Sequence, residues 1–277
     1  TFTMLRTPPA TAQGVNCGGA SSQVIVSEDF ESALSGWTGD LNTGNGSWES
    51  PSGSTSPSTG PNVGYGGGDF MNYEASATVS DTGTVISPMI DLSSASTSAE
   101  LSFWMHAYGS TIGTFTVGVG TSASGPFTTE FTWTGELQET AESEWANVGV
   151  DLTSYIGDSI YLAFTQTDGA GYYGDLSIDE ITVTSCVACA SPTSVVASAS
   201  GGSAVDVVMT DPGSAPEYFV TYTDGVTTDT VSPNPTSTSF SISGLTELTS
   251  YTISVQSLCS TGDTSISATT SVSYTHL

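Results

Sequence analysis

Positive charge is almost missing from this sequence. Its 277 residues contain one Lys+Arg, which is Arg6, against 28 Asp+Glu, so the formal net charge is −27. A nucleic-acid-binding protein needs clustered lysine and arginine to displace counterions from phosphate, and docking on an anionic membrane needs them too. Both classes of function are therefore excluded.

Long apolar runs are missing as well. No stretch approaches the ~20 apolar residues of a membrane span, so we expect no membrane insertion. Charged residues make up 10% of the chain, and the remaining polar residues are mostly Ser, Thr, Gly and Asn. Such a surface suits a secreted or cell-surface protein in salt water, where screening over roughly 8 Å limits self-repulsion. A hydrophobic content of 37% argues against disorder.

Histidine is scarce, with only His106 and His276 in the chain. A Ser-His-Asp triad needs an oriented histidine, and no G-x-S-x-G elbow precedes a helix. His106 lies in the stretch LSFWMHAYG (101–109), where apolar residues alternate as on a strand. We interpret His106 as a strand residue that is hydrogen-bonded within a sandwich. We therefore expect the chain not to be an enzyme. A glycosidase needs two facing carboxylates, and although the chain has many acidic residues, nothing in the sequence distinguishes such a pair.

Helical periodicity is nearly absent, whereas alternation with period two recurs between Gly, Ser and Pro turns. Examples in the first part are SQVIVSEDF, AELSFWMHAY and DSIYLAFTQ, and in the second part EYFVTYTDG and SYTISVQSL. Asp224-Gly225 is a hairpin signal. The pattern predicts an all-β fold with a jelly-roll sandwich first and an immunoglobulin-like sandwich second.

A seam near SCVACASP (185–192) divides the chain. We expect an N-terminal arm over residues 1–22, a first domain over 23–187 and a second domain over 188–277. Residues 42–68 form the longest stretch without a strand pattern, and we expect this loop to wrap over the sandwich with Trp48 as its anchor.

Four cysteines, Cys17, Cys186, Cys189 and Cys259, allow three disulfide pairings. A zinc site or a thioredoxin-type motif fits poorly, because the one CxxC stands alone between β-rich segments. We prefer Cys17–Cys186 with Cys189–Cys259, since each pair then closes one domain end to end.

The first domain resembles the MAM (meprin/A5/mu) domain, in the divergent form of secreted multidomain bacterial proteins of the Bacteroidetes type. The resemblance rests on marks that occur in the family's order: Asp29-Phe30-Glu31, Gly36-Trp37, Trp48, Gly60-Pro61, Phe70 to Ser76, Ile86-Ser87-Pro88, Ile90-Asp91-Leu92, Leu101 to Gly109, Trp145, Val150-Asp151-Leu152 and Ile178 to Ile181. It implies a jelly-roll sandwich that serves adhesion or substrate contact and not catalysis. The family often has Asp after the Gly-Pro turn, where this chain has Asn62.

Residues 190–277 resemble a fibronectin type III domain. Pro192 opens the first strand, Tyr218 to Tyr222 is the central strand, and Leu245 to Tyr251 matches the tyrosine corner. Met209 stands where a core Trp is usual. The resemblance implies a spacer or adhesion module, and it places Cys189 and Cys259 where bacterial versions carry paired cysteines.

A structural Ca²⁺ site is predicted where the first and last jelly-roll strands meet, because Ca²⁺ is held by carboxylate and carbonyl oxygens. The candidate ligands are Glu31, Asn62, Asp179, Asp29 and Glu180. The resemblance also implies a metal near these positions. The alternative is that they are solvated edge carboxylates in an acidic protein.

Carbohydrate binding is the main competing function. Its candidate aromatic platforms are Trp37, Trp48, Trp133 and Tyr172 with Tyr173, each of which is also explained as a core residue. Weak glycosylation signals are Asn45 in a sequon, and Ser159 and Thr230 in short O-glycosylation patterns.

We expect a secreted or surface-exposed binding or structural protein, active in adhesion or as a subunit of a surface filament. Its partners are then copies of itself or a surface glycan or protein, and the arm is a candidate assembly strand. The alternatives are an arm folded back on its own domain, and a carbohydrate-binding accessory region of a larger secreted enzyme.

Overall fold

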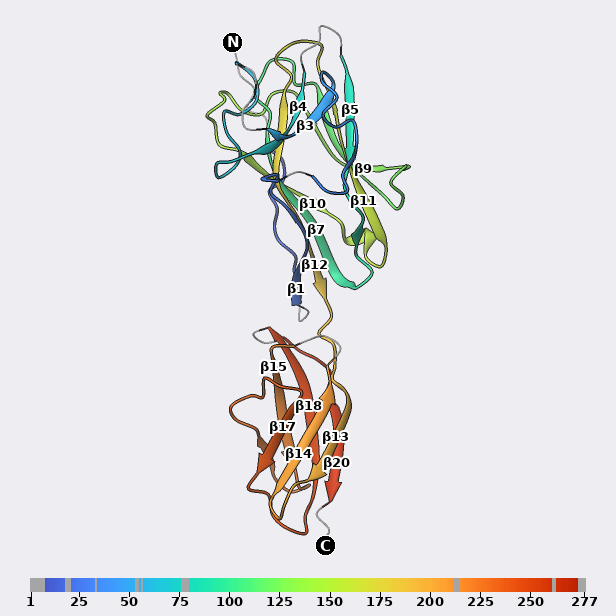
Figure 1. The fold of residues 1–277 in the computed structure, drawn as a ribbon, viewed down its shortest axis with the longest axis vertical. Coiled ribbons are helices and arrows are strands. Elements are labelled where there is room, and N and C mark those ends of the chain that lie inside the picture. Colours follow the sequence, from blue (N-terminus) through green and yellow to red (C-terminus); the bar gives the residue numbers. More distant parts are fainter. Residues whose placement is uncertain are drawn as a thin grey trace. The chain divides into compact units, whose positions relative to one another are not determined.

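The computed structural model describes residues 8–17, 21–32, 34–52, 55, 57–75, 80–211, 215–260 and 263–273. His276 lies outside the described residues. The described part is all-β, with strands β1 to β20 and one short 3₁₀ helix, Thr153–Tyr155 (Figure 1). None of its helices is long and apolar enough to cross a membrane. The predicted fold class is therefore confirmed.

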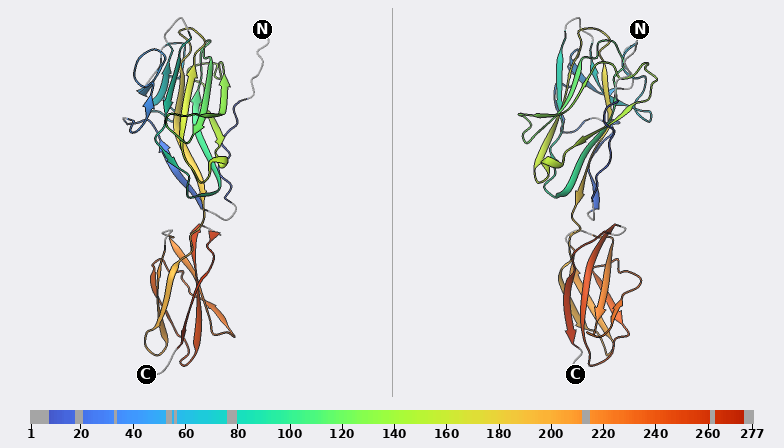
Figure 2. Two further views of the ribbon diagram at one scale, coloured as in Figure 1. Left: turned by 90° about the vertical axis from the view of Figure 1, so that its right-hand side faces the viewer. Right: turned by 180° about the vertical axis from the view of Figure 1, so that it is seen from behind.

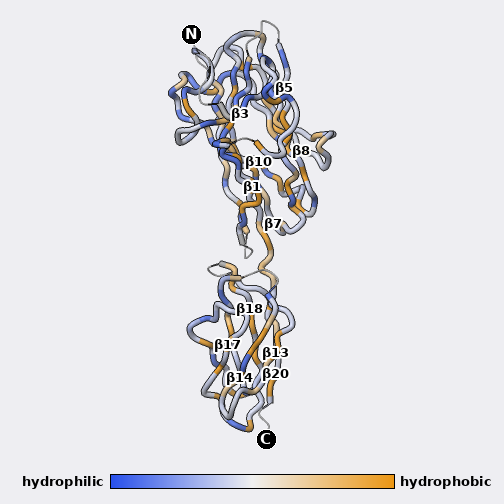
Figure 3. The backbone as a smooth tube through the Cα atoms, viewed as in Figure 1, coloured by the Kyte–Doolittle hydropathy of each residue, from blue (hydrophilic) through white to orange (hydrophobic). Residues whose placement is uncertain are grey.

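The chain separates into two compact units. The first contains the described residues up to Asn16 and from Ser22 to Cys186, and the second contains Cys17, Ser21 and the described residues from Val187 onward. Figure 3 shows apolar residues distributed along the strands of both units, with hydrophilic residues between them and in the loops. This distribution is expected where each unit has a hydrophobic core of its own.

The first unit is a sandwich of two antiparallel sheets. The first sheet has the order β10-β7-β12-β4-β3, with β1 paired to β12, and the second has the order β2-β5-β11-β8-β9, with β6 paired to β11. The strands of the first sheet are β1 (Ser21–Glu28), β3 (Ser47–Ser52), β4 (Phe70–Glu74), β7 (Ala95–His106), β10 (Ala146–Asp151) and β12 (Leu176–Val187). Those of the second are β2 (Thr38–Gly39), β5 (Thr82–Ile86), β6 (Ile90–Asp91), β8 (Thr114–Gly120), β9 (Thr128–Thr134) and β11 (Ser159–Thr167).

Aromatic contacts between the two sheets form the centre of this core. Phe103 of β7 meets Phe115, Phe131 and Phe164 of the opposite sheet edge-to-face, with ring centroids 6.0–6.1 Å apart. Leu101, Phe103 and Met105 are fully buried, as the alternation in this strand predicts. The sequence pattern therefore predicted this sandwich strand correctly.

The stretch 42–68 departs from the prediction in one respect. Ser47–Ser52 forms strand β3, which pairs with β4 through Trp48 opposite Tyr73. The register shifts between Glu49 and Ser52, around Pro51, and this irregularity hides the strand from a period-two search. The expected anchor is present, since Trp48 is fully buried and its indole N–H donates to the Gly83 carbonyl at 3.1 Å.

The second unit is a smaller sandwich with sheet orders β13-β14-β17 and β16-β15-β18-β19, and with β20 paired to β18 (Figure 2). Its strands are β13 (Thr193–Ala199), β14 (Ala204–Thr210), β15 (Glu217–Thr223), β16 (Thr228–Thr230), β17 (Ser239–Ser243), β18 (Ser250–Ser260), β19 (Asp263–Thr264) and β20 (Ala268–Ser273). The hairpin signal at Asp224-Gly225 is confirmed, because Thr223 and Thr228 pair across that turn.

Two predicted details of the second unit are also present. The hydroxyl of Tyr251 accepts a hydrogen bond from the backbone N–H of Thr246 at 3.1 Å, which is the predicted tyrosine corner. Met209 of β14 is a buried core residue. Cys189 and Cys259 form a disulfide bond, one of the two in the pairing preferred from the sequence. Cys17 and Cys186 are disulfide-bonded as well.

Candidate functional site

Two carboxylates of the first unit bind the backbone of one glycine-rich loop, residues 62–69. Asp179 of β12 accepts hydrogen bonds from the N–H of Tyr65 and from the N–H of Glu180, both at 2.8 Å. Glu31, just after β1, accepts from the N–H of Asp69 at 3.0 Å. Because β1 and β12 are neighbours in the sheet, both carboxylates reach the same loop.

The loop comes close to these carboxylates because it lacks side chains. A Cβ on Gly68 would lie 1.9 Å from Oε1 of Glu31. The Cβ position of Gly64 is ringed by three oxygens, Oδ2 of Asp179 at 2.9 Å and the carbonyl oxygens of Asp69 and Gly68 at 2.8 and 3.0 Å. Carboxylate and carbonyl oxygens therefore converge beside the loop, and they are the donor type that Ca²⁺ takes.

Asp179 carries the strongest electrostatic signal of this group. Its side chain is 2% exposed. Burial raises the pKa of Asp179 to about 7, the amide N–H groups of Glu180 and Tyr65 oppose the rise, and the charges of Glu180 and Glu31 add to it. The only Lys or Arg in the chain is Arg6, so no cationic side chain between residues 8 and 273 can neutralise this carboxylate.

The five predicted metal ligands do not all come together. Asp29 is exposed and accepts from the N–H of Glu31 at 3.2 Å. Glu180 is half-buried and has a positive φ of 48°. Asn62 donates its side-chain N–H to Glu142 at 2.7 Å. In the described part of the chain, no group of three or more His, Cys, Asp or Glu side chains is arranged to hold a metal. The residues that fit a hard cation are thus Glu31 and Asp179 with the loop carbonyls.

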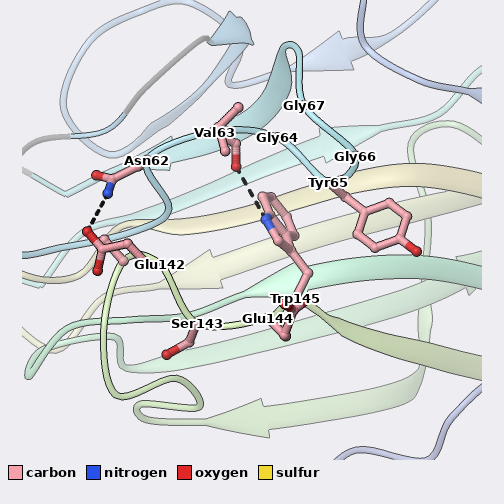
Figure 4. Close-up of a pocket in the computed structure, with 11 residues that line it drawn as sticks. Asn62, Val63, Gly64, Tyr65, Gly66, Gly67, Glu142, Ser143, Glu144 and Trp145 are labelled. Carbon is pink, nitrogen blue, oxygen red and sulfur yellow. Dashed lines mark hydrogen bonds between the residues drawn. The ribbon is translucent and has the colours of Figure 1, made fainter.

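The other side of the same loop forms a pocket of about 520 Å³. Its walls are residues 62–67 and residues 141–145 (Figure 4). Two hydrogen bonds connect the walls: the one from Asn62 to Glu142, and one from the Trp145 indole N–H to the Val63 carbonyl at 3.3 Å. A loop fixed on one side by the buried carboxylate of Asp179 and the exposed carboxylate of Glu31 thus supports a pocket on the other.

Aromatic rings hold the pocket walls. Tyr65 stacks on Trp104 with centroids 3.7 Å apart and planes 12° apart. Trp145 meets Phe70 and His106 edge-to-face at 5.8 and 5.5 Å. These contacts fix the ring of Trp145 beside Glu142 and Glu144, so the pocket offers an aromatic surface and two carboxylates.

His106 lies behind Trp145 and is fully buried. Among the described residues neither ring nitrogen has a hydrogen-bond partner, so the predicted hydrogen-bonded histidine is wrong in that respect. Burial lowers the pKa of His106 to about 4, and the backbones of Ser143 and Thr140 oppose this shift without reaching hydrogen-bond geometry. A fully buried, neutral imidazole of this kind packs in the core and is not placed to exchange a proton with a substrate.

The aromatic residues predicted as ligand platforms divide into two groups. Trp37 and Trp48 are core residues at 9% and 0% exposure, which rules them out as surface platforms. Trp133 packs against the same core, and its indole N–H donates to the Gly135 carbonyl at 2.7 Å. Tyr172 and Tyr173 are exposed. Only this tyrosine pair remains available as a flat surface.

The candidate glycosylation residues all lie on described segments. Asn45 is exposed in the turn before β3, whereas Ser47 of its sequon is buried and bonds to the Gly44 carbonyl at 2.6 Å. Ser159 begins β11 and is half-buried, and Thr230 ends β16 and is exposed. Whether any of them carries a glycan stays a prediction.

The pocket was missed at the sequence level. Its two walls are about eighty residues apart in the sequence, and neither wall contains a motif with a known ligand. The one usable signal was the GYGGG run at 64–68, where so many glycines indicate close approach of other groups to the backbone.

The comparisons with known proteins agree with the two sandwiches. Residues 29–189 match the MAM domain, meprin/A5/mu, and residues 190–273 match the fibronectin type III domain. Both are non-catalytic domain types, and disulfide-bonded modules of this kind are typical of extracellular proteins.

Solved structures resemble the chain only distantly. The glycoside hydrolase domain of Endo-D from Streptococcus pneumoniae R6 is 18% identical, with a TM-score of 0.32 over 75% of this chain and 34% of that one. Domains d3-d4 of the rat CD45 extracellular region are 17% identical, with a TM-score of 0.28 over 33% and 55%. The K2 cleaved adhesin domain of Lys-gingipain is 16% identical, with a TM-score of 0.39 over 59% and 97%.

The chain thus spans about a third of the Endo-D structure and just over half of the CD45 structure. The match over residues 29–189 covers more than half of the sequence, and it spans the segment in which the resemblance was identified from the residues. The chain belongs to the MAM domain family and carries a fibronectin type III domain directly after its MAM domain.

Proposed function

We propose that the chain is a non-catalytic extracellular protein that acts in adhesion or as a subunit of a surface structure. The observation that carries this proposal is the pocket between residues 62–67 and 141–145, whose walls are fixed by buried side chains. Preformed concave sites with a few polar groups are where proteins bind ligands. Its partner is a surface protein or glycan, or another copy of the chain.

The state of His106 supports a binding role over catalysis. Proton transfer requires a base within hydrogen-bond reach of a substrate and a pKa near the working pH. His106 is fully buried, and its pKa lies near 4. The pocket itself offers carboxylates, an amide and an indole, which suit recognition of polar groups.

A structural Ca²⁺ ion is the second part of the proposal. Glu31, Asp179 and the carbonyls of Gly68 and Asp69 would hold it, and Asp29, Glu180 and Asn62 would lie further out. When bound, the ion would neutralise two carboxylates and fix the loop that forms one pocket wall. The geometry that supports it is the set of oxygens around Gly64.

Calorimetric titration of the chelator-treated chain tests this site. We expect Ca²⁺ to bind and to raise the melting temperature, and Glu31→Gln to weaken both effects. Glu139→Gln is the matched control, because Glu139 is an exposed carboxylate of the same unit outside both the loop and the pocket. No heat of binding and no change in melting temperature would refute the calcium site.

The alternative function is a carbohydrate-binding accessory region of a larger secreted enzyme. The exposed pair Tyr172 and Tyr173, at 57% and 46% exposure, favours it, since stacked sugars need open aromatic faces. A glycan array and a pull-down with insoluble polysaccharide separate the two functions. The alternative would be supported if the wild-type chain is retained on polysaccharide and Tyr172→Ala abolishes that retention. Tyr222→Ala, in the second unit, is the control and should leave retention unchanged.

Electron microscopy of the purified chain, with and without residues 1–22, tests the assembly part of the proposal. Filaments or ordered arrays from the full chain would support a structural subunit. Unchanged assemblies from the truncated chain would refute a role for the arm.

A further inference from the structure

An extended segment, residues 8–16, lies along the edge strand β10 of the first unit. The N–H of Gly149 donates to the Ala10 carbonyl at 2.8 Å. The N–H of Ala12 donates to the side-chain oxygen of Asn147 at 3.0 Å. Strand β10 is the end member of its sheet, so the segment occupies the Gly149 N–H, a backbone group that an edge strand otherwise leaves open. The left view of Figure 2 shows this segment running along the side of the first unit.

Glu100 of β7 binds the end of the same segment with both carboxylate oxygens. The N–H of Gln13 donates to Oε1 at 2.9 Å, and the N–H of Gly14 donates to Oε2 at 2.7 Å. Such charge-assisted bonds to successive amides fix both the direction and the register of the bound segment. The contact therefore recognises one alignment of the peptide.

Gly149 makes room for the segment. A Cβ at this position would lie 2.5 Å from the Cα of Ala12 and 2.8 Å from its nitrogen. Real side chains do not approach a backbone this closely, so any other residue at 149 pushes the segment away. Pro9 is buried as well, which fixes the start of the segment. We call Glu100, Asn147 and Gly149 the acceptor edge.

The acceptor edge binds mainly backbone, and the side chains of Thr11 and Gln13 remain exposed. Its charge also selects the occupant. Glu100 is acidic, and residues 8–16 (PPATAQGVN) contain no acidic residue, although the chain has 28 Asp+Glu. This segment is therefore compatible with the edge where an acidic segment would be repelled.

We propose that the acceptor edge is a binding site for an extended peptide, and that its second occupant is the same segment of another copy of the chain. This inference rests on the proposed structural role and names its contact. Each copy offers one segment and one acceptor edge, so exchange forms either a reciprocal dimer or, where it runs head-to-tail, larger rings and open chains. Nine extended residues span at most ~30 Å, so the acceptor edge of one copy must lie within that distance of the point where the segment leaves the other copy.

The contacts in the exchanged and unexchanged forms are identical. The balance therefore depends on concentration, and a short tether gives the chain's own segment a millimolar advantage. The chain is then monomeric when dilute and exchanges when crowded, as on a cell surface.

A synthetic peptide of residues 8–16 tests the acceptor edge directly. Fluorescence anisotropy with a chain lacking residues 1–16 should show saturable binding that a scrambled peptide does not compete. Gly149→Val should weaken binding at least about tenfold, and Glu100→Gln should weaken it less, while Glu139→Gln should leave it unchanged. Absence of binding, or wild-type binding by a folded Gly149→Val chain, overturns the inference.

Sedimentation velocity of the full chain gives a second measurement that does not need the truncation. From micromolar to millimolar concentration the wild type should self-associate and Gly149→Val should stay monomeric; equal association of both chains contradicts the inference. If the peptide binds but neither sedimentation nor microscopy finds assembly, exchange between copies and the proposed structural role both fail, and only peptide binding at the acceptor edge stands. If assemblies form but the peptide does not bind, the acceptor edge fails as a binding site and the proposed structural role stands.

Discussion

The buried carboxylate of Asp179 accepts a hydrogen bond from the backbone N–H of Tyr65, at 2.8 Å and across 114 residues of sequence. The bond fixes the glycine-rich loop to strand β12, and the ring of the same tyrosine stacks on Trp104 of β7. One residue of the loop is thus held from two sides. The position of the pocket wall depends on this double attachment.

The ionisation of Asp179 should make the metal-free protein less stable as the pH rises. The pKa of Asp179 is about 7 in the folded chain and 3.8 as its ordinary value. The folded state therefore binds this proton more tightly, and the resulting stabilisation is complete below pH 3.8 and is lost as the pH rises through 7. The loss is roughly 4 kcal/mol of unfolding free energy. Urea denaturation with chelator at several pH values measures it. Asp179→Asn should remove this slope, and an unchanged slope would contradict the assignment.

His106 should act in the opposite direction over nearly the same range. Its folded pKa of about 4 lies below 6.5, so the unfolded chain binds more protons, and stability falls as the pH drops from 6.5 to 4. The loss is roughly 3 kcal/mol. His106→Leu should remove it and cost little at pH 7, because the unpartnered nitrogens are replaced by carbon. A large loss of stability at pH 7 would show that the ring has a polar partner.

The tyrosine corner offers a test within the second unit. Tyr251→Phe removes the hydroxyl that accepts from the Thr246 N–H and should lower the unfolding free energy by about 1 kcal/mol. Tyr222→Phe is the control, because Tyr222 touches Tyr251 edge-to-face and is only partly buried. Equal effects of the two substitutions in thermal denaturation would mean that the hydrogen bond contributes nothing.

The disulfide between Cys189 and Cys259 joins residues 70 apart and so closes most of the second unit into one loop. Replacing both cysteines by serine should lower the unfolding free energy of that unit by about 4 kcal/mol, since the unfolded chain regains the freedom of a long loop. Urea denaturation of the double variant measures the change. A loss below about 1 kcal/mol would indicate an already compact unfolded state.

Features that depend on local pattern were predictable from the sequence. The strand over 101–106, the hairpin at Asp224-Gly225 and the tyrosine corner each depend on neighbouring residues, and each is present. The sequence also indicated that Glu31 and Asp179 approach the same place, because the first and last strands of a jelly roll are neighbours.

Features that depend on distant pairing were not predictable. Asn62 was expected beside the carboxylates, but its amide reaches Glu142, eighty residues away. Trp37 and Trp48 were candidates both for a binding surface and for the core, and the packing of the two sheets decides for the core. The close contact between residues 8–16 and Gly149 is likewise not indicated by the local sequence of either segment.

Substitutions at two adjacent glycines test the stability of the loop and its proposed cation site independently. Gly67 and Gly68 both have positive φ, 92° and 112°, so alanine at either should cost about 1 kcal/mol or more in backbone strain. A Cβ on Gly67 meets nothing within 4 Å, whereas one on Gly68 displaces the Glu31 carboxylate. Glu31 is exposed and can move aside, so the two variants should lose similar stability.

Only Gly68→Ala should also weaken Ca²⁺ binding, because the displaced Glu31 leaves the Asp69 N–H and the loop carbonyls. Parallel urea denaturation and calorimetric titration of the two variants measure both quantities. Equal Ca²⁺ affinity in Gly67→Ala and Gly68→Ala would exclude Glu31 from the cation site, and a large difference in their stabilities would mean that Glu31 is held more rigidly than its exposure implies.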